Sequence, residues 1–193
     1  MPVLFMWVSF SQRPGSEGWE WELWNNRMSD RHIVYISVGS NMGDRLQNCR
    51  QGITALSRSG EFRIIAQSRI YMTEPVDYEY QEWFFNMVVK LETTNDPFEL
   101  LEKIKSVQRA AGRKRDVIRF GPRVLDLDII FFDDLVLDSD SLVLPHPRMH
   151  QRRFVLQPIC DIDPTIVHPV LKKDMQSLLA DLGKDEQKVI EYR

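Results

Sequence analysis

Hydrophobic and polar residues follow a regular pattern over most of the chain but not at its start. Residues 1–30 show neither the alternation of a strand nor the spacing of a helix, although four of the five tryptophans fall among them. We expect an N-terminal extension that is poorly ordered, because aperiodic termini are seldom held by the rest of a domain; a tryptophan-rich docking segment is the alternative. Met28 offers an alternative start. Residues 31–193 are expected to form a single domain.

From Ile33 onward the pattern predicts the element order β-α-β-β-α-β. Runs of β-branched and aromatic residues that end in turn signals indicate the strands, and helical spacing of apolar residues indicates the helices. Asp44 can cap the first helix and Asn95 or Asp96 the second, where Pro97 falls in the first turn. The order is that of a ferredoxin-like α+β fold, an antiparallel sheet with helices on one face. Strands are expected over residues 33–38, 63–72, 84–91 and 125–132, helices with apolar positions from Leu46 to Leu56 and from Phe98 to Val107, and helical additions near 154–159 and 175–182.

Composition and charge narrow the class of protein. Hydrophobic residues make up 43% of the 193 residues and charged residues 27%, as in soluble globular proteins. The net charge of −3 disfavours a chain that coats nucleic acid or an anionic membrane, and no apolar run approaches the length of a membrane span. Cys49 and Cys160 lie in no metal-binding spacing and are expected to be buried free thiols in a reducing compartment. We therefore expect a cytoplasmic protein with neither a nucleic acid nor a membrane as partner.

An abrupt reversal of charge marks the candidate site. Between residues 109 and 123 six basic residues stand against one acid, and between 124 and 140 six aspartates occur without a base. Such adjacent blocks predict a site where arginines hold a polyanion and carboxylates hold a cation. The basic residues are Arg109, Arg113, Lys114, Arg115, Arg119 and Arg123, and the aspartates are Asp126, Asp128, Asp133, Asp134, Asp138 and Asp140.

Asp126 and Asp128 are the most specific part of this pattern. Two residues apart on a strand, they point to the same face about 6.6 Å apart, where carboxylates can share one cation or hold two. Mg²⁺ suits them because it takes one or two carboxylates and completes its shell with water and substrate phosphates. A solvated edge strand is the alternative, but the apolar residues from Leu125 to Phe132 favour a central strand, where carboxylates without cations would be costly. Nearby arginines suit a triphosphate, while GxxxxGK[ST] and GxGxxG are both absent from the sequence.

Four segments of the chain are distinctive together. They are YISVGSNMGDR (35–45), GRKRDVIRFGPRVLDLDI (112–129), PHPRMHQRRFVLQPI (145–159) and, more weakly, YMTEPV with Asn86 downstream. In order and spacing, over about residues 33–182, the chain resembles the 6-hydroxymethyl-7,8-dihydropterin pyrophosphokinase (HPPK) family of folate biosynthesis. The resemblance implies transfer of diphosphate from ATP to the pterin hydroxymethyl group, with release of AMP and with two Mg²⁺ ions.

The resemblance also implies a role for each residue that matches a family motif. Asp126 and Asp128 would be the magnesium ligands, and Arg113 and Arg123 the catalytic arginines that clamp the phosphates. The nucleotide would be bound by Lys105, Gln108, Arg115, Ile129, His146 and Arg152, with residues 142–144 near the adenine. The pterin would be bound by Thr73, Glu74, Val76, Phe84, Asn86, Phe120 and Phe154, with the rings of Phe84 and Phe154 on its two faces.

Physical chemistry supports part of this assignment. A flat heterocycle buries well between aromatic rings, and an asparagine side chain offers a donor and an acceptor to an amide-like pterin edge. Phe84 and Asn86 are two apart on a predicted strand and so share a face. The chain departs from the family at Gln108, where a glutamate is usual, at Lys105 one turn earlier, and at Asp116 in the basic loop. In the family the positions of Gln108 and Lys105 help to recognise ATP, and Asp116 lies in the loop that is expected to hold the phosphates.

The expected mechanism is in-line attack of the pterin hydroxymethyl oxygen on the β-phosphorus of ATP, in an enzyme that works as a monomer. No residue is an obvious general base. The long polar loops over residues 73–83 and 112–123 are of the kind that closes over substrates. Two other classes stay open. One is a ferredoxin-like RNA-binding module, although the strands lack the aromatic-rich RNP1 pattern, and the other is a metal-dependent phosphohydrolase, which would hydrolyse ATP without a pterin.

Overall fold

A computed structural model describes most of the chain after the N-terminal extension. The ranges are residues 31–58, 60–76, 78–112, 121–183 and 187–193. The extension expected over residues 1–30 lies outside these ranges, and so do Asp116 and three predicted site residues, Arg113, Arg115 and Phe120.

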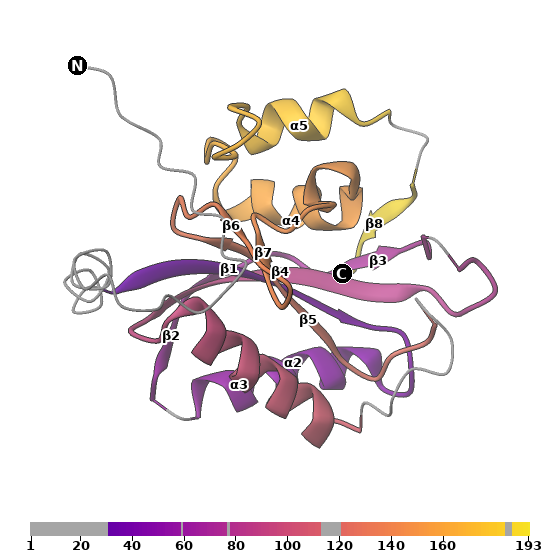
Figure 1. Cartoon of the computed structure of the whole chain (residues 1–193). Helices are drawn as coiled ribbons and strands as arrows, with labels where there is room; N and C mark the ends of the chain where they lie inside the picture. Colours follow the sequence, from indigo (N-terminus) through magenta and orange to yellow (C-terminus); the bar gives the residue numbers. More distant parts are fainter. Residues whose placement is uncertain (1–30, 59, 77, 113–120, 184–186) are drawn as a thin grey trace, which may run out of the picture.

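One antiparallel sheet forms the centre of the molecule (Figure 1). Its strands are β1 (His32–Ser40), β2 (Phe62–Gln67), β3 (Tyr71–Thr73), β4 (Phe84–Thr93), β5 (Asp126–Phe132) and β8 (Val189–Glu191). The strand order is β5-β1-β4-β3-β8, and β2 pairs with β4 as well. Together with the helices, this sheet confirms the α+β class that the sequence predicted.

Helices cover both faces of the sheet, as Figure 1 shows. The helices α2 (Arg45–Ser57) and α3 (Pro97–Ala110) lie on one face, where the sequence pattern expects them. The other face is covered by α4 (Arg153–Ile162) and α5 (Met175–Asp181), the two C-terminal additions. The sequence predicts the two C-terminal additions, but it does not indicate that they cover the second face of the sheet. The shorter elements are β6 (Leu137–Asp138), β7 (Val143–Leu144) and the 3₁₀ turn η1 (Met149–Gln151).

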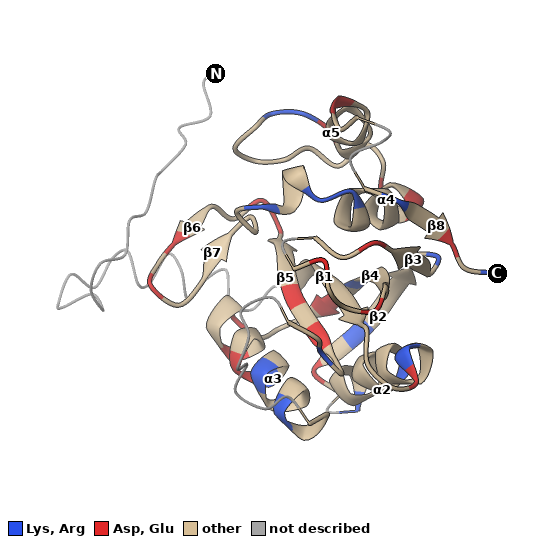
Figure 2. Ribbon diagram, turned by 90° about the vertical axis from the view of Figure 1, so that its right-hand side faces the viewer, with Lys and Arg blue, Asp and Glu red and all other residues tan. Residues whose placement is uncertain are grey.

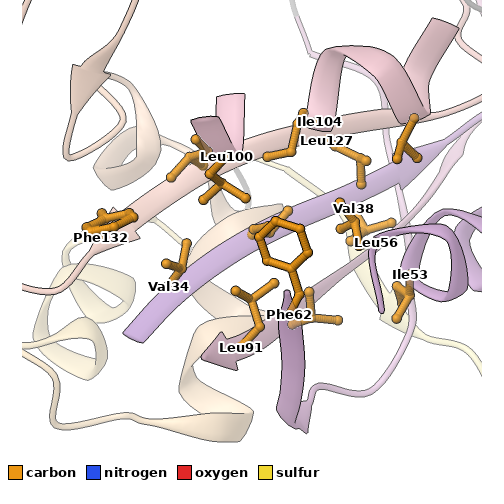
Figure 3. Close-up of a cluster of buried hydrophobic side chains, with 14 of the residues drawn as sticks. Val34, Val38, Ile53, Leu56, Phe62, Leu91, Leu100, Ile104, Leu127 and Phe132 are labelled. Atoms are coloured by element: carbon orange, nitrogen blue, oxygen red, sulfur yellow. The ribbon is translucent and has the colours of Figure 1, made fainter. Parts of the chain in front are cut away.

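Alternation along the strands divides the core into two clusters. Val34, Ile36 and Val38 of β1 pack toward α2 and α3, together with Leu91, Leu100 and other residues drawn in Figure 3. Tyr35 of β1 points to the opposite face and belongs to the cluster that α4 and α5 complete. Both faces of β1 are therefore buried, and the packing on both sides fixes the strand within the core.

Two aspartates cap the helices as the sequence predicts. The Asp44 carboxylate accepts a hydrogen bond from the Gln47 N–H at 3.0 Å at the start of α2. The Asp96 carboxylate accepts from the N–H of Glu99 at 2.8 Å, and the Glu99 side chain accepts from the Asp96 N–H, which completes a capping box at α3. Phe98 was expected on the apolar face of this helix, but its side chain is 39% exposed. The buried stripe begins instead at Pro97, one position before Phe98, and continues at Leu100, two positions after it.

The strand predicted over residues 63–72 is two strands. β2 ends at Gln67 and β3 begins at Tyr71, and both pair with β4. Between them the Ser68 hydroxyl accepts a hydrogen bond from the Val88 N–H at 2.9 Å, so a side chain replaces one bond of the backbone ladder. Ser68 carries no local signal for this contact, because its partner is 20 residues away.

The two cysteines are both free, as expected, but only one is fully buried. Cys49 is buried in α2, whereas Cys160 in α4 is half-buried. Among the described helices, none is both long enough and apolar enough to cross a membrane.

Candidate active site

The register of the sheet brings residues of three strands into one row. Gly39 of β1 lies opposite Asp126 of β5 on one side and opposite Asn86 of β4 on the other. Directly paired residues of an antiparallel sheet point to the same face, and here it is the face that Tyr35 shares with α4 and α5. At about 4.8 Å between strands, Asp126 and Asn86 are about 10 Å apart across the sheet. Figure 2 shows the acidic positions of β5 in red near the middle of the molecule.

Gly39 leaves the space between these two side chains open. A Cβ atom at this position would lie 2.7 Å from the Asn86 Oδ1 and 3.9 Å from the Asp126 Cβ. The first distance is shorter than any normal contact, so a side chain here would displace the Asn86 amide. The sequence pattern marks Gly39 only as a turn signal; its place in the row depends on the pairing of β1 with both neighbours.

Asp126 and Asp128 are both half-buried and alternate with the buried Leu127, as a period of two predicts. Arg123 Nη1 donates to Asp126 Oδ2 at 2.6 Å. Gln108, 4% exposed at the end of α3, donates from Nε2 to Asp126 Oδ1 at 3.2 Å and to the Leu127 carbonyl at 3.4 Å. Gln108, at the position where the resemblance implies a glutamate, thus contacts a predicted metal ligand.

The donor set fits Mg²⁺. Two hard carboxylates on one face offer oxygen ligands, and Mg²⁺ is commonly bound by one or two carboxylates plus water and substrate phosphates. Among the described residues, no group of three or more His, Cys, Asp or Glu side chains converges as a closed cage would require. An open pair of carboxylates suits an ion that arrives with a phosphate ligand better than it suits a permanently bound structural metal.

A cavity of about 300 Å³ opens beside Asp128. Leu101 and Ile104 of α3 line it together with Ile129, and residues 139–143 of the β6–β7 hairpin form another wall. Polar groups reach it from Asp128, from His146 and from residues 139–141 of the hairpin. A cavity that combines apolar side chains from α3 with several polar groups suits a heterocycle that carries a charged tail. Ile129 and the residues near 142–144 were predicted at the adenine, and this cavity brings them together.

His146 lies at this cavity as a neutral ring. Burial is the main cause that lowers its pKa to about 4, and the positive charges of Arg152 and Arg148 lower it further. The His146 Nδ1 accepts a hydrogen bond from the Arg148 N–H at 3.2 Å, which leaves the ring proton on Nε2. The imidazole can therefore donate one hydrogen bond to an anionic oxygen at neutral pH.

Predicted pterin contacts come from the sheet and from α4. Asn86 Nδ2 donates to Thr73 Oγ1 at 2.6 Å, and both side chains are almost fully buried. Phe84 begins β4 directly opposite Thr73 and is half-buried. Phe154 lies in the first turn of α4, with the Arg152 guanidinium carbon 5.4 Å from its ring centroid. The amide and the two rings thus belong to two layers of the fold.

Two residues that the sequence pattern did not single out hold the loop over residues 74–83. Asn41, 4% exposed, donates from Nδ2 to Gln81 Oε1 at 2.9 Å and to the Glu82 carbonyl at 3.2 Å. Arg45 Nη1 donates to the Trp83 carbonyl at 2.7 Å. The sequence signal at this place is the polar GSN turn after the first strand. It predicts a turn, but it does not indicate which loop residues Asn41 and Arg45 contact.

For two other predicted residues the structure shows a position but no contact to the groups named above. Lys105 Nζ pairs with Glu102 at 2.8 Å on α3 and is not among the described residues that line the cavity. Val76 is 43% exposed in the loop after β3. Their roles, like those of Arg113, Arg115 and Phe120 outside the described ranges, stay predictions.

Solved structures share the fold. One is the crystal structure of wild-type Plasmodium falciparum HPPK-DHPS with pterin and p-hydroxybenzoate, matched with a TM-score of 0.59 at 17% sequence identity. The match covers 79% of this chain and 42% of that chain. At this identity the likeness defines the class of fold, an HPPK-type α+β domain.

Sequence comparison identifies the family. The model of 7,8-dihydro-6-hydroxymethylpterin-pyrophosphokinase (HPPK) matches residues 35–164, and the chain belongs to this family. It is 44% identical over 131 residues to the 2-amino-4-hydroxy-6-hydroxymethyldihydropteridine pyrophosphokinase of Bacillus subtilis, covering 68% of this chain and 78% of that protein. The protein of the same name from Aquifex aeolicus is 36% identical over 143 residues, or 74% and 88% of the two chains.

Longer relatives contain the same region. The folic acid synthesis protein fol1 of Schizosaccharomyces pombe is 36% identical over 147 residues, which is 76% of this chain but 20% of that protein. The chain therefore spans most of the bacterial relatives and about a fifth of the fungal one. The resemblance seen in the sequence motifs is confirmed by these matches.

Proposed function

We propose that this chain transfers diphosphate from ATP to the hydroxymethyl group of 6-hydroxymethyl-7,8-dihydropterin, with release of AMP, in folate synthesis. Membership of the HPPK family supports the reaction class. The observation that carries the proposal for this site is the row of Asp126, Gly39 and Asn86 across three strands. A carboxylate for a phosphate-bound cation and an amide for a heterocycle thereby face the same space.

Asp126 and Asp128 would hold magnesium together with the ATP phosphates. The bound Mg²⁺ would neutralise phosphate charge and act as a Lewis acid toward the transferring group. Gln108 and Arg123 both hydrogen-bond the Asp126 carboxylate, so they orient it before any substrate binds. Preorganisation of this kind lowers the cost of assembling the charged site during the reaction.

Arg123 and His146 act on the phosphates. Arg123 carries a fixed positive charge and can donate to phosphate oxygens with the planar fork that suits them. His146 contributes a single donor from Nε2, since its pKa of about 4 keeps the ring neutral. The cavity beside Asp128 takes the adenine between Ile129 and the residues of α3. Lys105, Gln108, Arg115 and Arg152 complete the proposed nucleotide contacts, and Arg113 is the second proposed catalytic arginine.

The pterin binds over the start of β4. The Asn86 amide offers its remaining hydrogen-bonding capacity to the pterin edge, and the rings of Phe84 and Phe154 stack on the heterocycle, at about 0.5 to 1.5 kcal/mol for each stacked pair beyond burial. Backbone groups of Thr73, Glu74 and Val76 are the proposed partners of the pterin's other polar atoms. Phe120 is the further proposed aromatic contact.

The reaction itself is a single displacement. The hydroxymethyl oxygen forms a bond to the β-phosphorus of ATP, the bond from that phosphorus to the α-phosphate bridging oxygen breaks, and the hydroxyl proton is released. AMP leaves with the bridging oxygen. The protein contributes positioning and charge stabilisation, which are the main sources of rate in phosphoryl transfer.

An assay of AMP release tests this proposal. The chain is incubated with ATP and the dihydropterin, with and without Mg²⁺, and both products are quantified. Equal amounts of AMP and pterin diphosphate that require Mg²⁺ are expected. ATP hydrolysis of the same rate without the pterin would identify a phosphohydrolase instead, and filter binding to single-stranded RNA at moderate salt tests the RNA-binding alternative. We further propose that the enzyme works as a cytoplasmic monomer, without nucleic acid or membrane partners; sedimentation of the purified chain checks the oligomeric state.

A further inference from the structure

Gln187 is a buried polar residue that the proposed function leaves unassigned. It lies just before β8, and its side chain is only 7% exposed. Its Nε2 donates to the Glu74 backbone carbonyl at 2.8 Å, and its Oε1 accepts from the Phe154 backbone N–H at 3.3 Å. One side chain thus joins the loop after β3 to the first turn of α4, two segments that are separate in sequence.

The bond to Phe154 replaces a missing helix cap. Arg152 occupies the N-cap position of α4 and makes no side-chain cap hydrogen bond. The first N–H groups of a helix have no partner within the helix and need an acceptor from outside. Gln187 supplies that acceptor at the residue whose aromatic ring is proposed to stack on the pterin.

The bond to Glu74 is part of a larger attachment. The Glu74 N–H donates to the Lys188 carbonyl at 3.0 Å, and in the next pair along the strands Val189 of β8 lies opposite Thr73 of β3. Gln187 is therefore adjacent to a backbone pairing that joins residues 188 and 189 to residues 74 and 73. A side chain on such a support fixes both of its partners relative to the sheet.

We propose that Gln187 is a positioning residue for the pterin, which fixes the separation between the backbone of residues 73–76 and the ring of Phe154. The inference rests on the proposed function, because these two groups are its proposed pterin contacts. Gln187 acts through Glu74 and Phe154 without touching the substrate. A glutamine suits the position, since a single amide carries a donor for the carbonyl and an acceptor for the N–H.

Steady-state kinetics of Gln187→Ala and Gln187→Glu test the proposal. Gln187→Ala removes both bonds, and we expect KM and the equilibrium Kd for the dihydropterin to rise about tenfold while KM for ATP changes less than about twofold. Gln187→Glu keeps an acceptor for Phe154 but replaces the donor to Glu74 with a carboxylate oxygen, so pterin affinity is expected to fall there as well. Gln176→Ala, an exposed glutamine on α5, is the matched control and should leave both KM values unchanged.

The proposal is overturned if pterin affinity stays at the wild-type value in Gln187→Ala, or if the affinities for ATP and pterin fall together. Gln187→Asn keeps the amide but is one methylene too short to reach both partners. If Gln187→Ala does not fold, the same loss of pterin affinity is required of Gln187→Asn. The wild-type chain is assayed first: absence of pterin diphosphate there contradicts the proposed function, whereas an active wild type with unaffected variants contradicts only the role of Gln187.

Discussion

Two hydrogen bonds join Asn41 to the backbone of Arg123, one through the Asn41 side chain and one through its backbone. The Arg123 N–H donates to Asn41 Oδ1 at 2.6 Å, and the backbone N–H of Asn41 donates to the Arg123 carbonyl at 3.0 Å. The Asn41 amide nitrogen also donates to Gln81 and to the carbonyl of Glu82. One buried side chain therefore connects the proposed catalytic arginine to the loop that borders the proposed pterin site.

Replacing Asn41 is expected to lower turnover, although Asn41 is not among the proposed phosphate contacts. Asn41→Ala removes an acceptor of the Arg123 backbone N–H and a donor to the Glu82 carbonyl, so kcat should fall at least about tenfold and stability by about 1 to 3 kcal/mol. Asn41→Asp keeps the acceptor for Arg123 and loses only the donors to the loop, and it should retain more of kcat. AMP release and urea unfolding measure the two effects. Wild-type kcat in Asn41→Ala would contradict this coupling.

A methyl group at Gly39 is expected to damage pterin binding selectively. The added Cβ would lie 2.7 Å from the Asn86 Oδ1, so the amide must move. We expect KM for the dihydropterin to rise about tenfold or more in Gly39→Ala. The double variant Gly39→Ala with Asn86→Ala provides the control, because removal of the amide removes the clash. The double variant should be no worse than Asn86→Ala alone, and additive losses would show that Gly39 acts elsewhere.

Loss of one carboxylate of β5 should abolish magnesium-dependent turnover. Asp128→Asn keeps the shape of the side chain but removes the charge that a divalent cation needs, so kcat/KM is expected to fall about a thousandfold. Asp134→Asn makes the same change six residues further along, at an exposed position in the turn after the strand, and serves as the control. Turnover measured over a range of Mg²⁺ concentrations distinguishes weaker metal binding from loss of the chemical step. Near-normal activity of Asp128→Asn would refute the metal assignment.

His168 is expected to make the fold sensitive to acid. Its side chain is 5% exposed, and burial lowers its pKa to about 4, with smaller contributions from the charges of His150 and Lys172. The unfolded chain, with a pKa near 6.5, then binds more protons than the folded chain between pH 4 and 6.5. The contribution of His168 to the unfolding free energy is complete above about pH 6.5 and is lost as the pH falls toward 4, by at most roughly 3 kcal/mol.

His168→Asn tests this dependence with the local hydrogen bonds retained. The His168 Nδ1 accepts from the N–H groups of Val170 and Leu171, each at 3.2 Å, and an asparagine Oδ1 can take over the same two bonds. As the pH is lowered from 7 to 4, the unfolding free energy should fall less steeply for the variant than for the wild type. Parallel curves would mean that His168 titrates normally in the folded protein.

Features that depend on a few neighbouring residues could be predicted from the sequence. Asp44 and Asp96 cap their helices because the acceptor and the N–H groups lie within three residues of each other. Asp126 and Asp128 share a face because strand side chains alternate. The α+β class followed from the order of such local patterns.

Features that depend on tertiary contacts could not be predicted from the sequence. Gln187 reaches Glu74 across 113 positions and Asn41 reaches Arg123 across 82, so no local pattern could indicate either bond. The hydrogen bond from Gln108 to Asp126 is a further case, because it depends on the end of α3 lying beside the start of β5. The break at Ser68 likewise depends on a hydroxyl that reaches an opposite strand.

The row of Asp126, Gly39 and Asn86 has a consequence for how sequence change acts on the reaction. The offset between the proposed phosphate and pterin positions is built from two strand spacings, so backbone hydrogen bonds determine it and loop length does not. Insertions in the loops around it would leave that offset intact. A slip of one residue between β1 and β5 would turn both carboxylates to the α2–α3 face and would remove the site at once.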